Sequence, residues 1–113
     1  MADQPHLYII AGCNGAGKTT ASFVVLPELL DCNEFLNADE IAKGISPFHP
    51  EGVAISAGKI MLERIQYLIA SGKDFGFETT LSSKGIEAII DKARKSNFRI
   101  NLIFFWLDSV VSL

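Results

Sequence analysis

Apolar residues along the chain fall into two patterns: short apolar runs, and longer segments in which they recur every three or four positions. The short runs have the length of strands and are rich in Ile, Leu and Phe, a composition typical of strands that are buried on both faces of a sheet. They predict strands at residues 7–11, 35–37, 75–79 and 100–107.

The helical period appears between these runs. It predicts helices at residues 18–30, 51–71 and 84–96, with Pro27 expected to bend or shorten the first and Gly72 expected to cap the second. Two prolines within residues 46–50 predict a loop. Strands and helices therefore alternate, which predicts an α/β fold: a mostly parallel sheet of about four strands, covered by helices on both faces and joined by right-handed crossovers.

Composition narrows the class of protein. With 113 residues, 49% of them hydrophobic and 20% charged, the chain is expected to fold as a single domain over residues 1–113. The net charge of -3 and a pI near 5.3 argue against the broad basic surface that binds nucleic acid or an anionic membrane. No signal peptide or membrane anchor is visible, and two cysteines are too few for a disulfide framework. A cytoplasmic location is therefore expected.

A glycine-rich motif directly follows the first predicted strand. Residues 12–19 match the P-loop pattern G-x-x-x-x-G-K-[ST] at every fixed position. In such a loop the backbone N–H groups turn toward a phosphate, Lys18 brings a positive charge to the β and γ phosphates, and the Thr19 hydroxyl is placed to ligate Mg²⁺. We therefore expect a nucleoside triphosphate site made of Gly12, Cys13, Asn14, Gly15, Ala16, Gly17, Lys18, Thr19 and Thr20.

Two acidic residues lie at the ends of the next predicted strands. Asp39 follows the second strand, and Glu78 and Thr79 close the third. Ligands of open α/β sheets bind outside the carboxyl ends of the strands, so both carboxylates are expected to face the P-loop. A carboxylate there would orient and deprotonate a substrate hydroxyl, or hold a water on Mg²⁺. The alternatives are a helix N-cap for Asp39, opening residues 40–43, and a structural carboxylate with satisfied partners for Glu78.

Other polar and aromatic residues carry weaker signals. Asp108 has the position of a Walker B carboxylate after the fourth strand, with a plain turn residue as the alternative. His6 and His49 are expected at the surface, and the aromatic residues 104–106 are expected in the core.

Together these segments resemble the zeta toxin-like P-loop kinases. The resemblance runs through the P-loop, residues 35–42 (FLNADEIA), residues 45–47 (ISP) and residues 77–82 (FETTLS). It implies a three-layer P-loop kinase core that uses ATP and Mg²⁺, with Lys18 and Asp39 as catalytic residues. Asp39 would be the general base or hydroxyl-orienting residue, and would contact the acceptor together with Glu78 and Thr79. Characterised toxins of this family phosphorylate a sugar hydroxyl of UDP-N-acetylglucosamine, so the resemblance implies a small-molecule acceptor of that kind.

At the C-terminal end this sequence differs from the family that it resembles. Family members continue past the fourth strand into an arginine-bearing helix and lid, so the sequence is expected to be the N-terminal portion of a longer family domain, with an incomplete sheet. Arginines of such a lid neutralise charge on the transferring phosphoryl group.

Two hypotheses follow. One is an ATP-dependent kinase of zeta toxin type. The other is a catalytically inactive nucleotide-binding module that associates with itself, or with an antitoxin-like partner, through an exposed sheet edge. A GTPase is disfavoured, because the sequence has no Asn-Lys-x-Asp segment.

Overall fold

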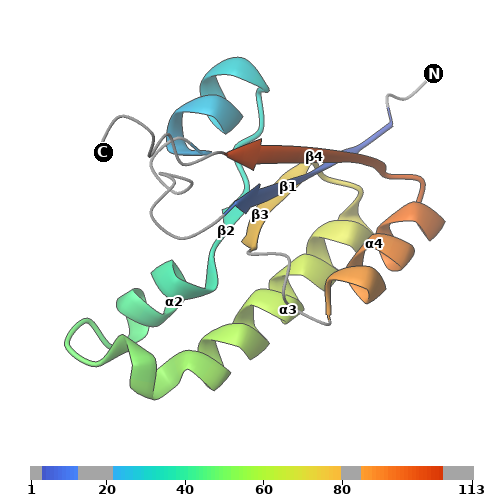
Figure 1. Cartoon of the computed structure of the whole chain (residues 1–113). Coiled ribbons are helices and arrows are strands. Elements are labelled where there is room, and N and C mark those ends of the chain that lie inside the picture. The colour runs from blue at the N-terminus through green and yellow to red at the C-terminus, as the bar shows by residue number, and fades with distance from the viewer. Residues whose placement is uncertain (1–3, 13–21, 80–84, 106–113) are drawn as a thin grey trace.

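The computed structural model describes residues 4–12, 22–79 and 85–105, and these form an α/β arrangement of a parallel sheet between helices (Figure 1). In chain order the elements are β1 His6–Gly12, the π-helix η1 Val25–Leu29, β2 Phe35–Leu36, α2 Ala38–Ile45, the 3₁₀ helix η2 Pro50–Val53, α3 Ala54–Ser71, β3 Phe75–Thr79, α4 Ile86–Lys95 and β4 Arg99–Phe105. The alternation of strands and helices predicted from the apolar pattern is confirmed.

The described part of the sheet has four strands in the order β2-β3-β1-β4, and every neighbouring pair is parallel. In this register Ala11 lies between Thr79 of β3 and Phe104 of β4. The carboxyl ends of the three longer strands are therefore level at one edge of the sheet.

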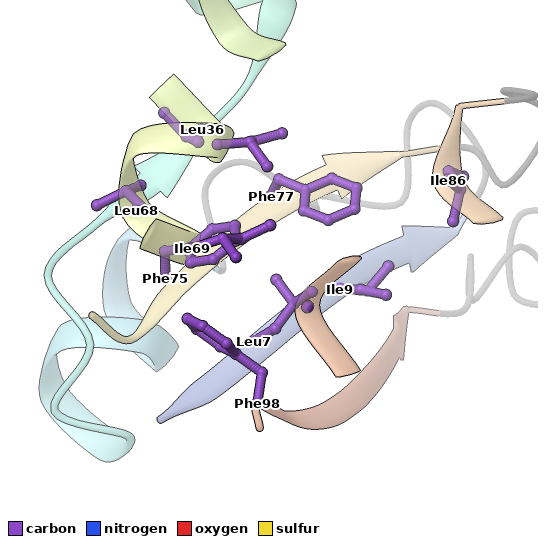
Figure 2. Close-up of a cluster of buried hydrophobic side chains, with 11 residues drawn as sticks. Leu7, Ile9, Leu36, Leu68, Ile69, Phe75, Phe77, Ile86 and Phe98 are labelled. Atoms are coloured by element: carbon purple, nitrogen blue, oxygen red, sulfur yellow. The ribbon is translucent and has the colours of Figure 1, made fainter. Parts of the chain in front are cut away.

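Side chains of β1 alternate between two separate apolar clusters, as expected for a strand that is buried on both faces. Leu7 and Ile9 join the larger cluster under α3 and α4, which Figure 2 shows. Tyr8 and Ile10 join a smaller cluster with Leu26 of η1. Helices therefore cover both faces of the sheet, with η1 on the opposite side from α3 and α4 (Figure 1). Right-handed crossovers require this division when the chain moves from β1 to one edge and from β3 to the other.

Helix α3 ends where the sequence provides a specific cap. Helix α3 stops at Gly72, which has a φ of 68°, and the N–H of Lys73 donates to the Leu68 carbonyl oxygen at 3.2 Å. This left-handed cap is the one predicted from the sequence, because Gly adopts a positive φ without steric cost. The predicted helix 51–71 differs at its start, where Pro50 opens a 3₁₀ turn before α3 begins at Ala54.

Strand β4 departs from the prediction that it is buried on both faces. Leu102 is 61% exposed and Phe104 is 42% exposed. Both share a face with Ile9 by register, and only Ile100 of β4 packs against the larger cluster. The prediction that residue 104 lies in the core is therefore wrong, because β4 is the edge of the described sheet.

The two histidines differ in their surroundings. His6 begins β1, is partly buried and stacks on Tyr8 with ring centroids 5.6 Å apart, so the expectation of a simple surface residue is wrong for it. His49 is exposed, as expected.

No helix among the described residues is long and apolar enough to cross a membrane.

Candidate functional site

The chain reverses its direction of travel across the sheet between β1 and β3. From β1 it passes to β2 at one edge, whereas from β3 it passes over β1 to β4 at the other edge. Ligands of open α/β sheets bind at such a switch point, in the crevice outside the carboxyl ends of the strands. The candidate site of this chain therefore lies where β1 and β3 end.

The first P-loop residue stands at this switch point. Gly12 is the last residue of β1 and has a φ of 141°, a backbone conformation that residues with a side chain rarely adopt. Residues 13–20, with Lys18 and Thr19 among them, lie outside the described residues, as does Asp108. The expected nucleotide contacts of these residues stay predictions.

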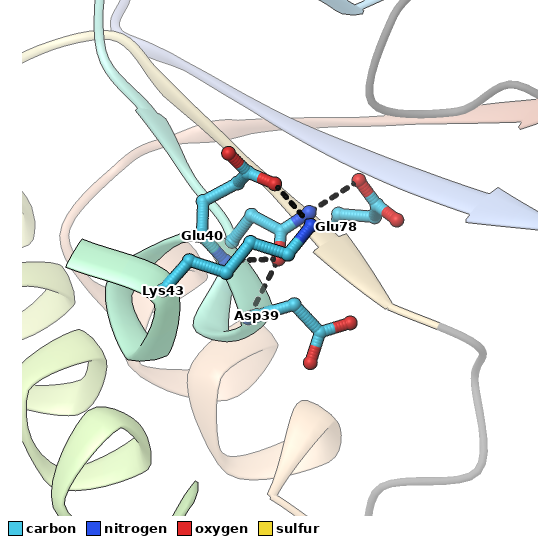
Figure 3. A network of polar contacts seen from close by, with 5 residues as sticks. Asp39, Glu40, Lys43 and Glu78 are labelled. Carbon is cyan, nitrogen blue, oxygen red and sulfur yellow. Dashed lines mark hydrogen bonds and ion pairs between the residues drawn. The ribbon is translucent and has the colours of Figure 1, made fainter. Parts of the chain in front are cut away.

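A side-chain network joins the next two elements of the site. Asn37, directly after β2, accepts hydrogen bonds at its Oδ1 from the N–H groups of Asp39 (2.7 Å) and Glu40 (3.2 Å). Its Nδ2 donates to Oε1 of Glu78 at 2.8 Å. Figure 3 shows Asp39 and Glu40 on the first turn of α2 and Glu78 on the neighbouring strand β3. The two predicted acidic residues are thus brought together through a third residue.

Asn37 is the N-cap of α2, which corrects the alternative in which Asp39 caps residues 40–43. Asp39 lies inside the first helical turn, where a carboxylate interacts favourably with the helix dipole. Sequence reasoning assigned Asn37 to the strand and missed its role. The available signal was Asn followed three residues later by Glu40, a spacing that is typical of a helix start.

The side chain of Asp39 is exposed and makes no hydrogen bond or ion pair with the described residues. It lines a cavity of about 330 Å³ together with Lys43, Pro50 and Glu51. A carboxylate in this setting is open to a ligand, because no donor in the described part of the chain occupies it. The geometry fits a group that accepts a proton from a bound hydroxyl.

Glu78 and Thr79 line a larger cavity of about 610 Å³, together with residues of α3 and α4. Most of its other walls are apolar side chains of these helices, among them Ile55, Met61, Leu62, Ile65, Ile86 and Ile89. Ala38 lines both this cavity and the one beside Asp39. The N-terminus of α2 therefore separates the two cavities, and each of them holds one of the two carboxylates.

Two described groups have a shifted pKa, and both lie on the face of the sheet that η1 covers, away from α3 and α4. Burial raises the pKa of the Tyr8 phenol and of the Cys32 thiol, both in the smaller apolar cluster under η1. Within the described residues no group of three or more His, Cys, Asp or Glu side chains is placed to hold a metal ion.

Two solved structures share this fold. A candidate kinase from Chloroflexus aurantiacus has a TM-score of 0.72 at 17% identity, over 93% of this chain and 61% of that one. The structure of the PezAT chromosomal toxin-antitoxin system of Streptococcus pneumoniae has a TM-score of 0.76 at 18% identity, over 91% of this chain and 47% of that one. The likeness shows the fold, and the chain spans less than two thirds of either structure.

Sequence comparison gives the family directly. None of the curated proteins matches the chain. The zeta toxin family model matches residues 1–113, so the chain belongs to the zeta toxin family.

Proposed function

We propose that the chain is the core of an ATP-dependent kinase that transfers the γ-phosphate to a hydroxyl of a small acceptor. The observation that carries this proposal is the convergence of Asp39 and Glu78 at the carboxyl edge of the sheet, where β1 runs into the P-loop motif. A nucleotide in the loop and an acceptor beside α2 would then share one crevice. Family membership supports the same reaction type.

The nucleotide side of the proposed site belongs to the P-loop. Gly12 opens the loop with a positive φ, which fits a backbone that must turn sharply toward a phosphate. Lys18 would contact the β and γ phosphates, and the Thr19 hydroxyl would hold Mg²⁺. The ion, when bound, neutralises charge that develops on the phosphates.

On the acceptor side, Asp39 is the proposed general base. Its exposed carboxylate would accept the proton of the acceptor hydroxyl while that oxygen forms a bond to the γ-phosphorus and ADP leaves. Glu78 and Thr79 would bind polar groups of the acceptor at the end of the larger cavity. That cavity, at about 610 Å³, is within the range of small-molecule pockets and has room for a nucleotide sugar such as UDP-N-acetylglucosamine.

The experiment is a transfer assay with γ-labelled ATP, Mg²⁺ and a panel of hydroxyl acceptors that includes UDP-N-acetylglucosamine. Asp39→Asn is expected to lower kcat by about 10²–10⁴-fold, the usual contribution of a general base. Glu40→Gln is the matched control, since Glu40 is the next carboxylate on the same turn and pairs with Lys43 at 3.4 Å. Equal rates for these two variants would contradict the role of Asp39. Lys18→Ala should abolish both nucleotide binding and transfer.

A second candidate function is a nucleotide-binding module that acts through protein association. The observation in its favour is the exposure of Leu102 and Phe104 on β4, which is the edge of the described sheet and offers an apolar surface suited to a partner. The partner would be an antitoxin-like protein or a second copy of the chain. Sedimentation distinguishes the two functions: a monomer that turns over ATP and acceptor contradicts the module, whereas an oligomer that binds ATP without transfer contradicts the kinase.

A further inference from the structure

Asn37 is one of the few buried polar residues of the described chain, with 7% of its surface exposed. Both the oxygen and the nitrogen of its side-chain amide make hydrogen bonds. The oxygen accepts from two backbone N–H groups of α2, and the nitrogen donates to the Glu78 carboxylate on β3. A single side chain therefore connects the helix that carries Asp39 with the strand that carries Glu78.

These contacts fix the orientation of the amide. If the amide were flipped, its NH₂ group would face two N–H donors and its oxygen would face a carboxylate, so all three hydrogen bonds would be lost. The bond to Glu78 is also charge-assisted, which makes it stronger than a bond between neutral groups. The network thus has one favourable arrangement.

We propose that Asn37 is a positioning residue of the acceptor site, which holds the first turn of α2 and the Glu78 carboxylate at a fixed separation. This inference rests on the proposed kinase function, in which Asp39 and Glu78 act on the same acceptor. Without the amide donor, Glu78 would lose the contact that ties its carboxylate to the first turn of α2, and the acceptor hydroxyl would be held less precisely against Asp39. A misplacement of about 1 Å at a reacting centre can cost about 100-fold in rate.

The first test separates the two contacts of Asn37. Asn37→Ser keeps an oxygen that caps α2, since Ser is as good an N-cap as Asn, but its short hydroxyl does not replace the amide donor to Glu78. We expect kcat/KM for the acceptor to fall by about 10- to 100-fold, the effect of losing a hydrogen bond to a charged group. The KM for ATP should stay within about twofold, because the P-loop is untouched.

The matched control is Asn101→Ser. Asn101 is also a partly buried amide, and its Nδ2 donates to the Leu7 carbonyl oxygen at 3.2 Å, away from the acceptor site. This variant is expected to lower Tm while kcat/KM for the acceptor stays unchanged. If Asn37→Ser and Asn101→Ser change Tm and kcat/KM in the same proportion, Asn37 has only a structural role and the proposal is overturned.

A double-mutant cycle tests the link to Glu78 without any need for catalysis. Asn37→Asp keeps the cap but places a second carboxylate at the position that now lies 2.8 Å from Glu78, so Tm should fall through like-charge repulsion. Adding Glu78→Gln restores a donor and an acceptor with their roles exchanged, and Tm should recover at least half of the loss. Strictly additive Tm changes would mean that the two side chains are not paired, and would overturn the proposal.

The kinetic test and the Tm cycle together also distinguish the failure of this inference from the failure of the proposed function. If the full-length protein transfers no phosphate to any acceptor although the Tm cycle shows coupling, then the kinase function fails and the positioning role falls with it. If transfer occurs and Asn37→Ser leaves kcat/KM for the acceptor unchanged, only the positioning role fails.

Discussion

Gly76 on β3 is the position where the structure makes the strongest prediction about stability. It lies opposite Tyr8 in the parallel register, and Leu26 of η1 packs over both strands. A Cβ at position 76 would lie 3.1 Å from Leu26 Cδ1, 3.2 Å from the Tyr8 carbonyl oxygen and 3.4 Å from Tyr8 Cβ. Two of these three contacts belong to Tyr8 of the central strand β1, which has little freedom to move.

Gly76→Ala should therefore destabilise the fold. Overpacking in a core costs about 1–3 kcal/mol, and the reduced freedom of the unfolded chain returns about 0.4–1 kcal/mol. The net loss is about 0–2.6 kcal/mol, which at about 4 °C per kcal/mol for a domain of this size lowers Tm by up to about 10 °C. Gly76→Val should cost more, because its two extra methyl groups go deeper into the same contacts.

Gly58→Ala is the matched control, since it makes the same chemical change in α3 where a Cβ meets nothing within 4 Å. Ala is the better helix former by about 0.5–1 kcal/mol, so Tm should rise by about 2–4 °C. The assay is thermal unfolding followed by circular dichroism at one pH and salt concentration. If Gly76→Ala raises Tm as much as Gly58→Ala does, the close packing of η1 on the sheet is refuted.

Three further predictions concern the cap of α3, the core and the buried thiol. Gly72→Ala should lower the stability by about 1 kcal/mol in chemical unfolding, because its φ of 68° strains any residue with a Cβ; no change would contradict the left-handed cap. Phe75 and Phe98 have ring centroids 5.8 Å apart in edge-to-face geometry, so a double-mutant cycle with Leu at both positions should show a coupling of about 0.5–1.5 kcal/mol, and additive losses would argue against that contact. Burial raises the pKa of the Cys32 thiol, so the unfolded thiol ionises first and stability should fall as pH rises above its ordinary value of 9.0. In a Cys13→Ser background, adding Cys32→Ala should reduce the loss of stability as pH rises above 9.0. If the proteins with and without Cys32→Ala lose equal stability, the raised pKa of Cys32 is contradicted.

Much of the fold could be predicted because the apolar pattern is local and strong. The strand at residues 75–79 and the cap at Gly72 were predicted at the positions where the structure has them. Both depend on neighbours in the sequence: a short segment that is rich in large apolar residues is readily buried inside a sheet, and a glycine after a helical pattern adopts a positive φ without steric cost. The parallel order then follows from the alternation of strands and helices.

The acidic residues of the candidate site could also be predicted, but their connection could not. The sequence placed Asp39 and Glu78 at strand ends, and the rule for open sheets placed both near the P-loop motif. That Asn37 caps the helix and also holds Glu78 depends on β2 lying beside β3, a contact between residues 41 positions apart in the chain. No periodicity over a short window carries that information.

Short-range spacing along the chain is therefore sufficient to predict most of the elements, the P-loop motif and the residue types available for chemistry. Which face of each strand is covered, and which side chains meet, follows instead from the order of the strands in the folded sheet. Leu102 illustrates this limit, since it lies in an apolar run that Asn101 alone interrupts, while its place at the edge of the described sheet leaves it 61% exposed. Burial is a property of the neighbours that a residue acquires on folding, and the order of the strands sets those neighbours.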